Sequence, residues 1–210
     1  LYTRWFQYGT FLPMQRSPGS GVKKEIYNLG KKGDWVYDSE EKYINLRYAL
    51  LPYLYSTGWQ VTDNAGSFLR ALFMDFNEDK KVHTISNQYM FGKAFLVTPV
   101  TRNMYVFSDK EQWKDPYEDF SKTGTQDVYL PKGTKWFDFW TGEVLNGGQM
   151  VTKEVPIDII PLYVRAGSIV PFGPKVQYST EKKWNNLEIR IYPGADGEFV
   201  LYEDENDNYN

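Results

Sequence analysis

A short loop near the amino terminus combines a guanidinium and a hydroxyl with two residues that shape the backbone. These residues are Arg16, Ser17, Pro18 and Gly19. The aromatic stretch before them predicts an amphipathic helix ending at Gly9, followed by a strand over 11–16. Helix, strand and loop in this order form one unit of an α/β barrel or of a doubly wound sheet. In such folds the residues just past the carboxyl end of a strand line the ligand site, so we expect this loop to contact a ligand.

Arg16 is the side chain that we expect nearest to the ligand. A guanidinium can pair with a carboxylate through two parallel hydrogen bonds, and Arg16 would in this way orient a catalytic carboxylate. A buried salt bridge without a part in catalysis explains the same residue. Trp35, in the loop that contains Gly33, is a candidate for a wall of the site, although a tryptophan in a loop under a barrel more often has a packing role.

Five carboxylates of the amino-terminal part stand in no pattern that indicates catalysis, and helix caps and solvated turns account for them. They are Asp34, Asp38, Asp75, Glu78 and Asp79. Asp75 follows a predicted buried strand and is expected to pair with Arg70 or Arg16. His83 is the sole histidine and cysteine is absent, so we predict neither a metal site nor a cofactor.

The composition is that of a globular protein. Of the 210 residues, 41% are hydrophobic and 24% are charged, which does not fit a disordered chain. The net charge of -3 comes without a basic run, so a nucleic-acid partner is not indicated. The apolar runs are shorter than the ~20 residues that a membrane span needs. Because the chain begins with Leu1 rather than methionine, we expect its natural amino terminus elsewhere.

Helical and strand patterns alternate in the first part of the chain. Asp38 indicates the start of a helix, in which Pro52 should produce a kink. The apolar run over 67–76 predicts a strand buried on both faces of a parallel sheet, and 84–91 predicts a short helix. This order matches the closing quarter of a (β/α)8 TIM barrel. Since such a barrel needs about 250 residues, the remaining strands are expected on a preceding segment.

From residue 94 onward the pattern changes to short strands punctuated by glycine and proline, as in a β-sandwich. Strands are predicted at 94–100, 126–130, 135–139, 149–156 and 162–171. A polar insertion occupies 101–125, a length that is usually functional or mobile in the absence of secondary structure. A hairpin formed by 187–192 and 198–202 is predicted near the carboxyl end.

The fold class predicted from these patterns is α/β plus all-β. Residues 1–93 form the carboxyl-terminal end of a (β/α)8 catalytic barrel, 94–174 a proximal β-sandwich domain, and 175–210 the start of a distal β-domain. An isolated hairpin is marginally stable in water, which is why the last part is interpreted as an incomplete domain.

Motifs along nearly the whole chain are similar, in the same order, to those of one enzyme family. They lie at 5–13, 46–55, 88–92, 96–100, 129–133 with 136–142, and 161–168. They resemble glycoside hydrolase family 31, the retaining α-glucosidases and α-xylosidases. The resemblance implies a parent enzyme that hydrolyses α-xylosidic or α-glucosidic bonds of an oligosaccharide. A bacterial periplasmic or extracellular location is favoured over the cytoplasm.

Retaining hydrolysis requires a nucleophilic carboxylate and a second carboxyl group that acts as acid and then as base. In the family both are aspartates on earlier barrel strands, and neither motif occurs in this sequence. The resemblance therefore implies that the chain holds no catalytic residue, is inactive alone and needs the upstream barrel segment as its partner. The family also carries a sugar-contacting histidine where this chain has Pro18, which has no side-chain donor.

Two other interpretations stay open. The chain would be a non-catalytic carbohydrate-binding or structural β-module, although the apolar run over 67–76 argues against a module that folds without a covered sheet. Alternatively, Pro18 would mark a relative that has lost hydrolysis and keeps a scaffold role. Preference for a pentose or a hexose and oligomeric state leave no trace in the sequence.

Overall fold

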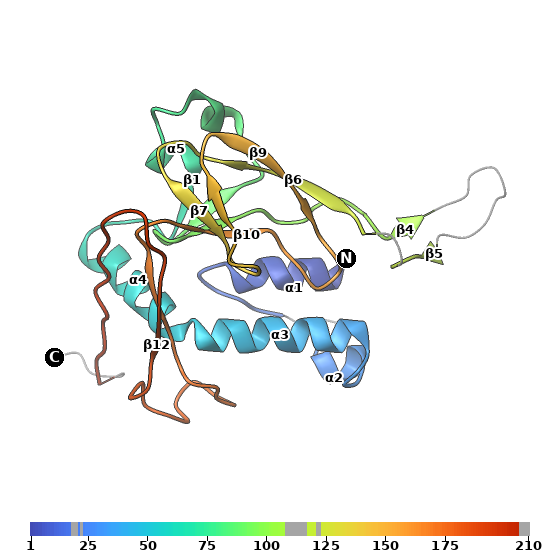
Figure 1. The fold of residues 1–210 in the computed structure, drawn as a ribbon. Coiled ribbons are helices and arrows are strands. Elements are labelled where there is room, and N and C mark those ends of the chain that lie inside the picture. The colour runs from blue at the N-terminus through green and yellow to red at the C-terminus, as the bar shows by residue number, and fades with distance from the viewer. Residues whose placement is uncertain (18–20, 22, 108–116, 121–122, 206–210) are drawn as a thin grey trace.

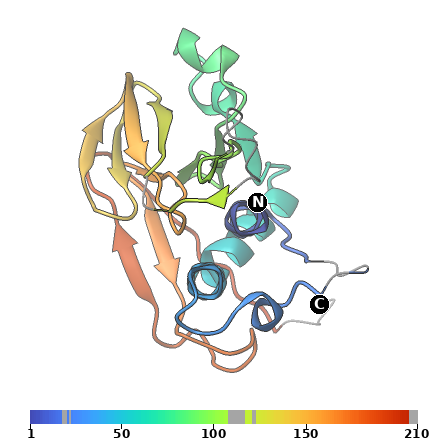
Figure 2. The same cartoon turned by 90° about the vertical axis from the view of Figure 1, so that its right-hand side faces the viewer.

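The structure is a computed structural model that describes residues 1–17, 21, 23–107, 117–120, 123–205 of the chain. A layer of helices lies against a layer of antiparallel strands (Figure 1). The helices are α1 (Tyr2–Thr10), α2 (Ile26–Leu29), α3 (Trp35–Ala49) and α4 (Leu51–Asp63). Figure 2 looks almost along the axes of α1 and α3, which lie side by side. None of the described helices is long and apolar enough to cross a membrane.

The predicted helix over 1–9 is present, but the strand predicted after it is wrong. Helix α1 ends at Thr10, and the residues from Phe11 to Ser17 form turns and irregular backbone. Their carbonyl oxygens accept hydrogen bonds from side chains of α3 and β2 instead of from a neighbouring strand. A segment whose polar backbone groups are satisfied in this way has no need of a sheet partner.

The long helix begins one turn earlier than predicted and is divided rather than kinked. Helix α3 begins at Trp35, and the Asp38 carboxylate accepts a hydrogen bond from the Gly33 N–H at 3.0 Å. Pro52 lies in the first turn of α4, where its missing N–H has no hydrogen-bonding role to fill. The carbonyl of Ala49 at the break accepts a hydrogen bond from Gly173 at 2.7 Å, which ties the helical layer to the β layer.

The apolar run over 67–76 is not a buried parallel strand. It contains the short strand β1 (Leu69–Ala71) and one helical turn, α5 (Leu72–Asp75), where Phe73 and Met74 are half exposed. The helix predicted at 84–91 is also wrong, because this region forms the 3-10 helix η1 (Lys80–Thr84) and strand β2 (Tyr89–Phe91). Strands β1 and β2 pair antiparallel, and all strand pairs within the described residues are antiparallel.

The main sheet has six strands in the order β1-β2-β3-β10-β7-β8. Its other strands are β3 (Phe95–Val97), β7 (Lys135–Asp138), β8 (Val144–Asn146) and β10 (Leu162–Arg165). The boundary predicted after residue 93 falls between β2 and β3, which are hydrogen-bonded neighbours in this sheet. Two of the predicted strands, 94–100 and 135–139, are confirmed in position.

Three two-stranded pairs accompany the main sheet. They are β6 (Thr125–Leu130) with β9 (Gln149–Glu154), β11 (Ile169–Phe172) with β12 (Glu188–Ile191), and β4 (Val106–Phe107) with β5 (Tyr117–Glu118). The first of these pairs confirms the strands predicted at 126–130 and 149–156. The strand predicted at 162–171 is two strands, β10 and β11, because Gly167 turns the chain between them with a φ of 85°.

The hairpin predicted near the carboxyl end is wrong. Strand β12 pairs with β11, in a register that places Val170 opposite Arg190, and 198–202 carries no strand. The turn at Gly167 brings the chain close to Gly197, where a Cβ would meet the Gly167 carbonyl oxygen. Much of the insertion at 101–125, like Pro18, Gly19 and the last five residues, lies outside the described part of the chain.

The main sheet separates two hydrophobic clusters because alternate residues of a strand point to opposite faces. Phe95 and Val97 face the first cluster, which the helices cover with Phe11, Tyr43 and Tyr53. Leu96 points to the opposite face, into the second cluster. That cluster also contains Leu72, Met90, Val128, Leu130, Trp136 and Tyr163. The β layer therefore has a core of its own and shares a second core with the helices.

Candidate functional site

Side chains of two other elements form hydrogen bonds to the backbone of residues 10–17, which we call the Arg16 segment. Arg47 of α3 donates to the carbonyl oxygens of Thr10 at 2.7 Å, Leu12 at 2.5 Å and Pro13 at 2.8 Å. The hydroxyl of Tyr89 donates to the carbonyl oxygen of Phe11 at 2.9 Å. Four consecutive carbonyls thus accept hydrogen bonds from two side chains, and burial lowers the pKa of the Arg47 guanidinium.

Arg16 and Ser17 lie exposed at the end of this segment. The Ser17 hydroxyl contacts the hydroxyl of Tyr2, which also donates to the carbonyl of Lys24 at 3.2 Å. Pro18 lies just outside the described residues, so its contacts stay a prediction. Asp75 pairs with Arg70 and not with Arg16, which confirms one of the two expected partners; the ionised atoms lie 2.9 Å apart and both side chains are largely buried.

Trp35 is 41% exposed at the start of α3 and meets an aromatic ring from the insertion. Its ring centroid lies 4.7 Å from that of Phe120, which in turn lies 5.2 Å from the ring of Tyr105. These partners were not predicted, because local periodicity does not connect residue 35 to residue 120. The aromatic residues within the polar insertion were the feature of the sequence that could have indicated a contact with the rest of the fold.

The helical layer and the β layer are joined by the loop over 155–159. Arg4 of α1 donates to the carbonyls of Val155 at 2.8 Å, Pro156 at 3.1 Å and Ile159 at 2.6 Å. Gln7 donates to the carbonyl of Ile157 at 2.6 Å. Burial lowers the pKa of Arg4, and the neighbouring tyrosines oppose that shift. These contacts fix α1 against the β layer.

Glu40 is a titratable group that the sequence analysis passed over. Its side chain is fully buried, and neither carboxylate oxygen has a hydrogen-bond partner among the described residues. Burial raises the pKa of Glu40 to about 7, and the Thr3 hydroxyl opposes part of that shift. Glu40 is therefore largely protonated below neutral pH, which reduces the cost of burying it.

The described residues contain no group of three side chains suited to hold a metal ion. The ring of His83 contacts the carbonyl oxygen of Asn77 at 2.9 Å through Nε2, at the surface. Asp79 caps η1 by accepting a hydrogen bond from the Lys81 N–H at 3.3 Å. Its carboxylate also accepts hydrogen bonds from the Tyr129 hydroxyl at 2.7 Å and the Lys132 N–H at 2.9 Å. These contacts agree with the structural roles predicted for the carboxylates of this part.

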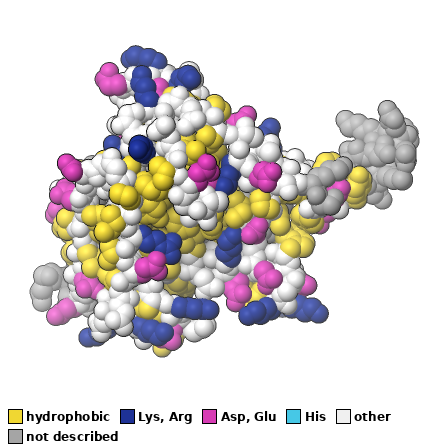
Figure 3. All heavy atoms as spheres, in the orientation of Figure 1, with side chains coloured by type: hydrophobic (Ala, Val, Ile, Leu, Met, Phe, Trp, Pro, Cys, Tyr) yellow, Lys and Arg dark blue, Asp and Glu magenta, His cyan; other side chains and the backbone are white. Residues whose placement is uncertain are grey.

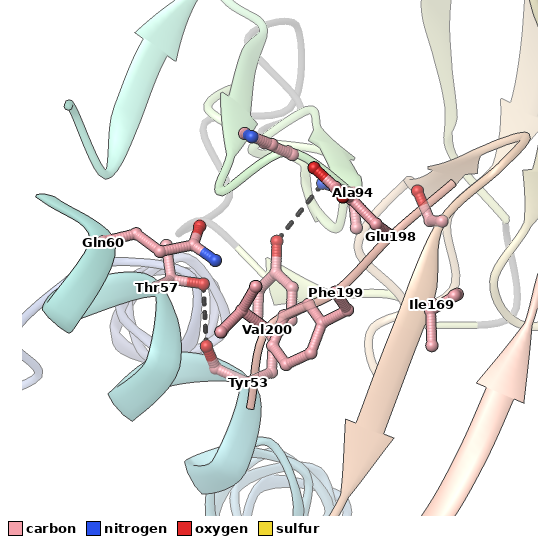
Figure 4. A pocket seen from close by; sticks show the side chains of 10 residues that line it. Tyr53, Thr57, Gln60, Ala94, Ile169, Glu198, Phe199 and Val200 are labelled. Atoms are coloured by element: carbon pink, nitrogen blue, oxygen red, sulfur yellow. Dashed lines mark hydrogen bonds between the residues drawn. The ribbon is translucent and has the colours of Figure 1, made fainter. Parts of the chain in front are cut away.

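Neither of two hollows in the described structure is lined by a predicted site residue. The smaller, about 60 Å³, lies beside α4 and is well below the ~300–1,000 Å³ of a typical ligand pocket. Figure 4 shows the Tyr53 hydroxyl in this hollow, directed toward the backbone of Ala94, from which it accepts a hydrogen bond at 3.2 Å. The larger, about 610 Å³, is lined by polar side chains together with Tyr55 and Trp184.

Two family models match this chain. The model of the glycosyl hydrolases family 31 TIM-barrel domain matches residues 1–57, and that of the family 31 C-terminal domain matches 65–170. The first match ends within α4 and the second begins just before β1, upstream of the boundary predicted from the sequence. All six strands of the main sheet lie within the second match.

Curated relatives and solved structures agree with these matches. The alpha-xylosidase of Saccharolobus solfataricus is 38% identical over the whole chain, and alpha-glucosidase 2 of Bacillus thermoamyloliquefaciens is 29% identical. The GH31 alpha-xylosidase structure from Xanthomonas citri has a TM-score of 0.83 and 43% identity over 97% of this chain. A Flavobacterium johnsoniae GH31 dextranase, solved with isomaltotriose, has a TM-score of 0.80 and 32% identity over the same share.

The chain spans only a part of each of these proteins. It covers 26% of the alpha-xylosidase from Saccharolobus and 24% of the alpha-glucosidase from Bacillus. Of the two solved chains it covers 20% and 23%. Matches of this kind over the barrel end and the following domain identify the chain as a member of glycosyl hydrolase family 31.

Proposed function

We propose that this chain is the carboxyl-terminal part of a retaining α-glycoside hydrolase that acts on α-xylosidic or α-glucosidic bonds. The observation that carries the proposal is the Arg16 segment, which belongs to the matched barrel domain and is held by Arg47 with an exposed guanidinium at its end. The relatives include both an alpha-xylosidase and an alpha-glucosidase, so both substrates belong to the proposal.

We further propose that the nucleophile and the acid/base are supplied by a preceding barrel segment. Two largely buried carboxylates of the described chain already have structural partners: Asp75 binds Arg70, and Asp138 binds Lys153. Large apolar side chains near the amino terminus are exposed, with Trp5 at 60%, Met14 at 76% and Tyr27 at 73%. Hydrophobic side chains also form a broad band across the face shown in Figure 3. Exposed apolar area of this kind marks a surface that contacts further protein.

In this proposal Arg16, the position of Pro18 and Trp35 line the sugar site. The division of the chain is proposed to fall within 58–64, the stretch between the two family matches, rather than at residue 93. Residues 175–210 are proposed as the start of a distal β-domain.

The test compares the isolated chain with a longer protein that carries it. Purified residues 1–210 should release no aryl group from an aryl α-xyloside or an aryl α-glucoside above the blank, whereas the full-length protein should hydrolyse at least one of them. Turnover by the isolated chain would show that the catalytic carboxylates were wrongly assigned upstream. Absence of turnover by the full-length protein on both substrates would reject the hydrolase proposal.

A second candidate function, a carbohydrate-binding module, is favoured by the larger hollow. Tyr55 and Trp184 line it with their ring centroids 6.0 Å apart, and the Tyr55 hydroxyl donates to the Asp204 carboxylate at 2.8 Å. Aromatic faces beside a fixed carboxylate suit a sugar ring. Calorimetric titration of the isolated chain with xyloglucan or maltose oligosaccharides tests this function. Sub-millimolar binding that Trp184→Ala removes would favour the module.

A further inference from the structure

We propose that Arg47 and Tyr89 are positioning residues that set the place of the Arg16 guanidinium in the sugar site. This inference rests on the proposed hydrolase function, because it deepens the description of the same site. Neither side chain is placed in contact with substrate. Both act through the backbone of the Arg16 segment, from two different elements, α3 and β2.

The carbonyl oxygens of residues 10 to 13 each accept a hydrogen bond from a side chain, at 2.5 to 2.9 Å. Nη1 of Arg47 donates to the carbonyls of Thr10 and Leu12, and Nη2 donates to that of Pro13. The Tyr89 hydroxyl donates to the remaining carbonyl, that of Phe11. Because no strand pairs with this segment in the described structure, the side chains of Arg47 and Tyr89 take the place of a strand partner for its carbonyls.

A guanidinium is suited to hold several carbonyls at once. Its five N–H groups point in fixed directions within one plane, which lets one side chain bind several carbonyls at defined angles. Burial lowers the pKa of Arg47, but arginine keeps its charge at neutral pH, and hydrogen bonds to a charged donor are about twice as strong as neutral ones. A lysine ammonium is a compact charge on a flexible stem and cannot reproduce this pattern.

The carbonyls that Arg47 and Tyr89 bind lie close to Arg16 along the chain. Pro13 and Arg16 are three residues apart, so their Cα atoms are separated by at most about 11 Å. Between them Gln15 makes a further contact, since its Nε2 donates to the carbonyl of Phe6 at 3.4 Å. Displacement of the carbonyls therefore displaces the Arg16 Cα, and a displacement of about 1 Å in a catalytic group is enough to reduce turnover by about a hundredfold.

The experiment uses the full-length protein and a double-mutant cycle on kcat/KM for the aryl α-glycoside that it hydrolyses. Arg47→Lys should lower kcat/KM about tenfold or more, with the loss mainly in kcat, and Tyr89→Phe should lower it by a smaller factor. In an Arg16→Met background, Arg47→Lys should change kcat/KM by less than about twofold, because residues that act through one another are not additive.

A matched control separates positioning from general stability. Arg4 also binds three backbone carbonyls, those of the loop over 155–159, and Arg4→Lys removes a comparable set of hydrogen bonds away from the Arg16 segment. It should lower the melting temperature about as much as Arg47→Lys while keeping kcat/KM within about twofold. Equal losses of kcat/KM in the two variants would overturn the proposal. So would a loss in Arg47→Lys that is unchanged in the Arg16→Met background.

A second measurement decides the proposal when no hydrolysis is found, or when a variant does not fold. Amide hydrogen exchange at Phe11 and Leu12, whose N–H groups donate to the carbonyls of Tyr8 and Gly9, should become faster in Tyr89→Phe and in Arg47→Lys of the full-length protein, but not in Arg4→Lys. Unchanged exchange in Tyr89→Phe, which removes a single hydroxyl, would overturn the positioning role. The hydrolase proposal stands or falls separately, on the turnover of the unaltered full-length protein.

Discussion

Arg4 donates a hydrogen bond at 2.6 Å to the carbonyl oxygen of Ile159, a residue 155 positions away in the sequence. The same guanidinium also donates to the carbonyl oxygens of Val155 and Pro156. Together with Gln7, which donates to the carbonyl oxygen of Ile157, this side chain joins the first helix to the β layer. The position of α1 against the β layer therefore depends on hydrogen bonds to one short loop.

Removal of the Arg4 guanidinium should destabilise the chain strongly. Arg4→Met leaves the carbonyls of Pro156 and Ile159 without the donor that the structure shows, whereas that of Val155 keeps the Tyr105 hydroxyl. Each unsatisfied buried polar group costs about 1–3 kcal/mol. Allowing for water at the loop, we expect the free energy of unfolding to fall by about 3 kcal/mol in urea denaturation. Arg102→Met is the control, since Arg102 is exposed and donates one hydrogen bond to Thr125. A fall no larger than in the control would contradict the joining role.

Gly92 should tolerate no side chain, for two separable reasons. Its φ of 59° lies in the left-handed region, and a Cβ there would stand 2.0 Å from the Tyr53 hydroxyl. The Tyr53 hydroxyl donates to the Phe91 carbonyl and accepts from Ala94, so it cannot move away without losing both hydrogen bonds. Gly92→Ala should lower the free energy of unfolding by about 3 kcal/mol or more.

The matched control for Gly92 is Gly133, whose φ is 91° and whose added Cβ would meet no atom within 4 Å. Gly133→Ala should show the cost of the backbone conformation alone, about 1 kcal/mol. The difference between the two variants, measured by thermal or urea unfolding, isolates the contact with Tyr53. Equal destabilisation by both substitutions would show that the contact with Tyr53 contributes nothing.

Glu40 should make the stability of the chain depend on pH. Burial raises the pKa of Glu40 from its ordinary value of 4.5 to about 7, so the folded state binds the proton more tightly than the unfolded state. The stabilising contribution is complete below about pH 4.5 and is lost as pH rises through about 7. Glu40→Gln removes this loss, because the amide cannot ionise. Urea unfolding at pH 5 and pH 8 should therefore show a smaller decrease in the variant than in the native chain.

The control for this titration is Glu41→Gln, which removes one carboxylate from the next residue of α3. The pH dependence of stability should stay as in the native chain. If the native chain and Glu40→Gln lost the same stability between pH 5 and pH 8, the buried carboxylate would not be the group that titrates.

Replacement of Pro18 by histidine should increase hydrolysis by the full-length protein. Proline offers no side-chain donor, and a new hydrogen bond to a sugar hydroxyl is worth up to about 1.5 kcal/mol, or about tenfold in kcat/KM. Pro18→Ala distinguishes the gain of an imidazole from the mere loss of the proline ring. Equal turnover of the native form and Pro18→His would remove Pro18 as a marker of altered function.

Several features followed from the sequence alone. The family resemblance rested on short motifs spread over nearly the whole chain, and the strands β6, β7 and β9 lie where short segments between glycine and proline residues predicted them. Of the two partners expected for Asp75, Arg70 lies in the same apolar run and forms the ion pair. These predictions succeeded because burial on one face of an element leaves a periodic record in the sequence.

The choice of backbone partners was decided by the tertiary structure. The segment after Phe11 has the apolar content of a strand, yet Arg47 and Tyr89, distant in sequence, satisfy its carbonyls. Strand β12 pairs with β11 although the nearer stretch over 198–202 has a suitable pattern. Periodicity records which side of an element is buried, but a backbone carbonyl can accept from any donor that the fold brings close. Which donor arrives depends on the whole fold, and for the Arg16 segment it is Arg47.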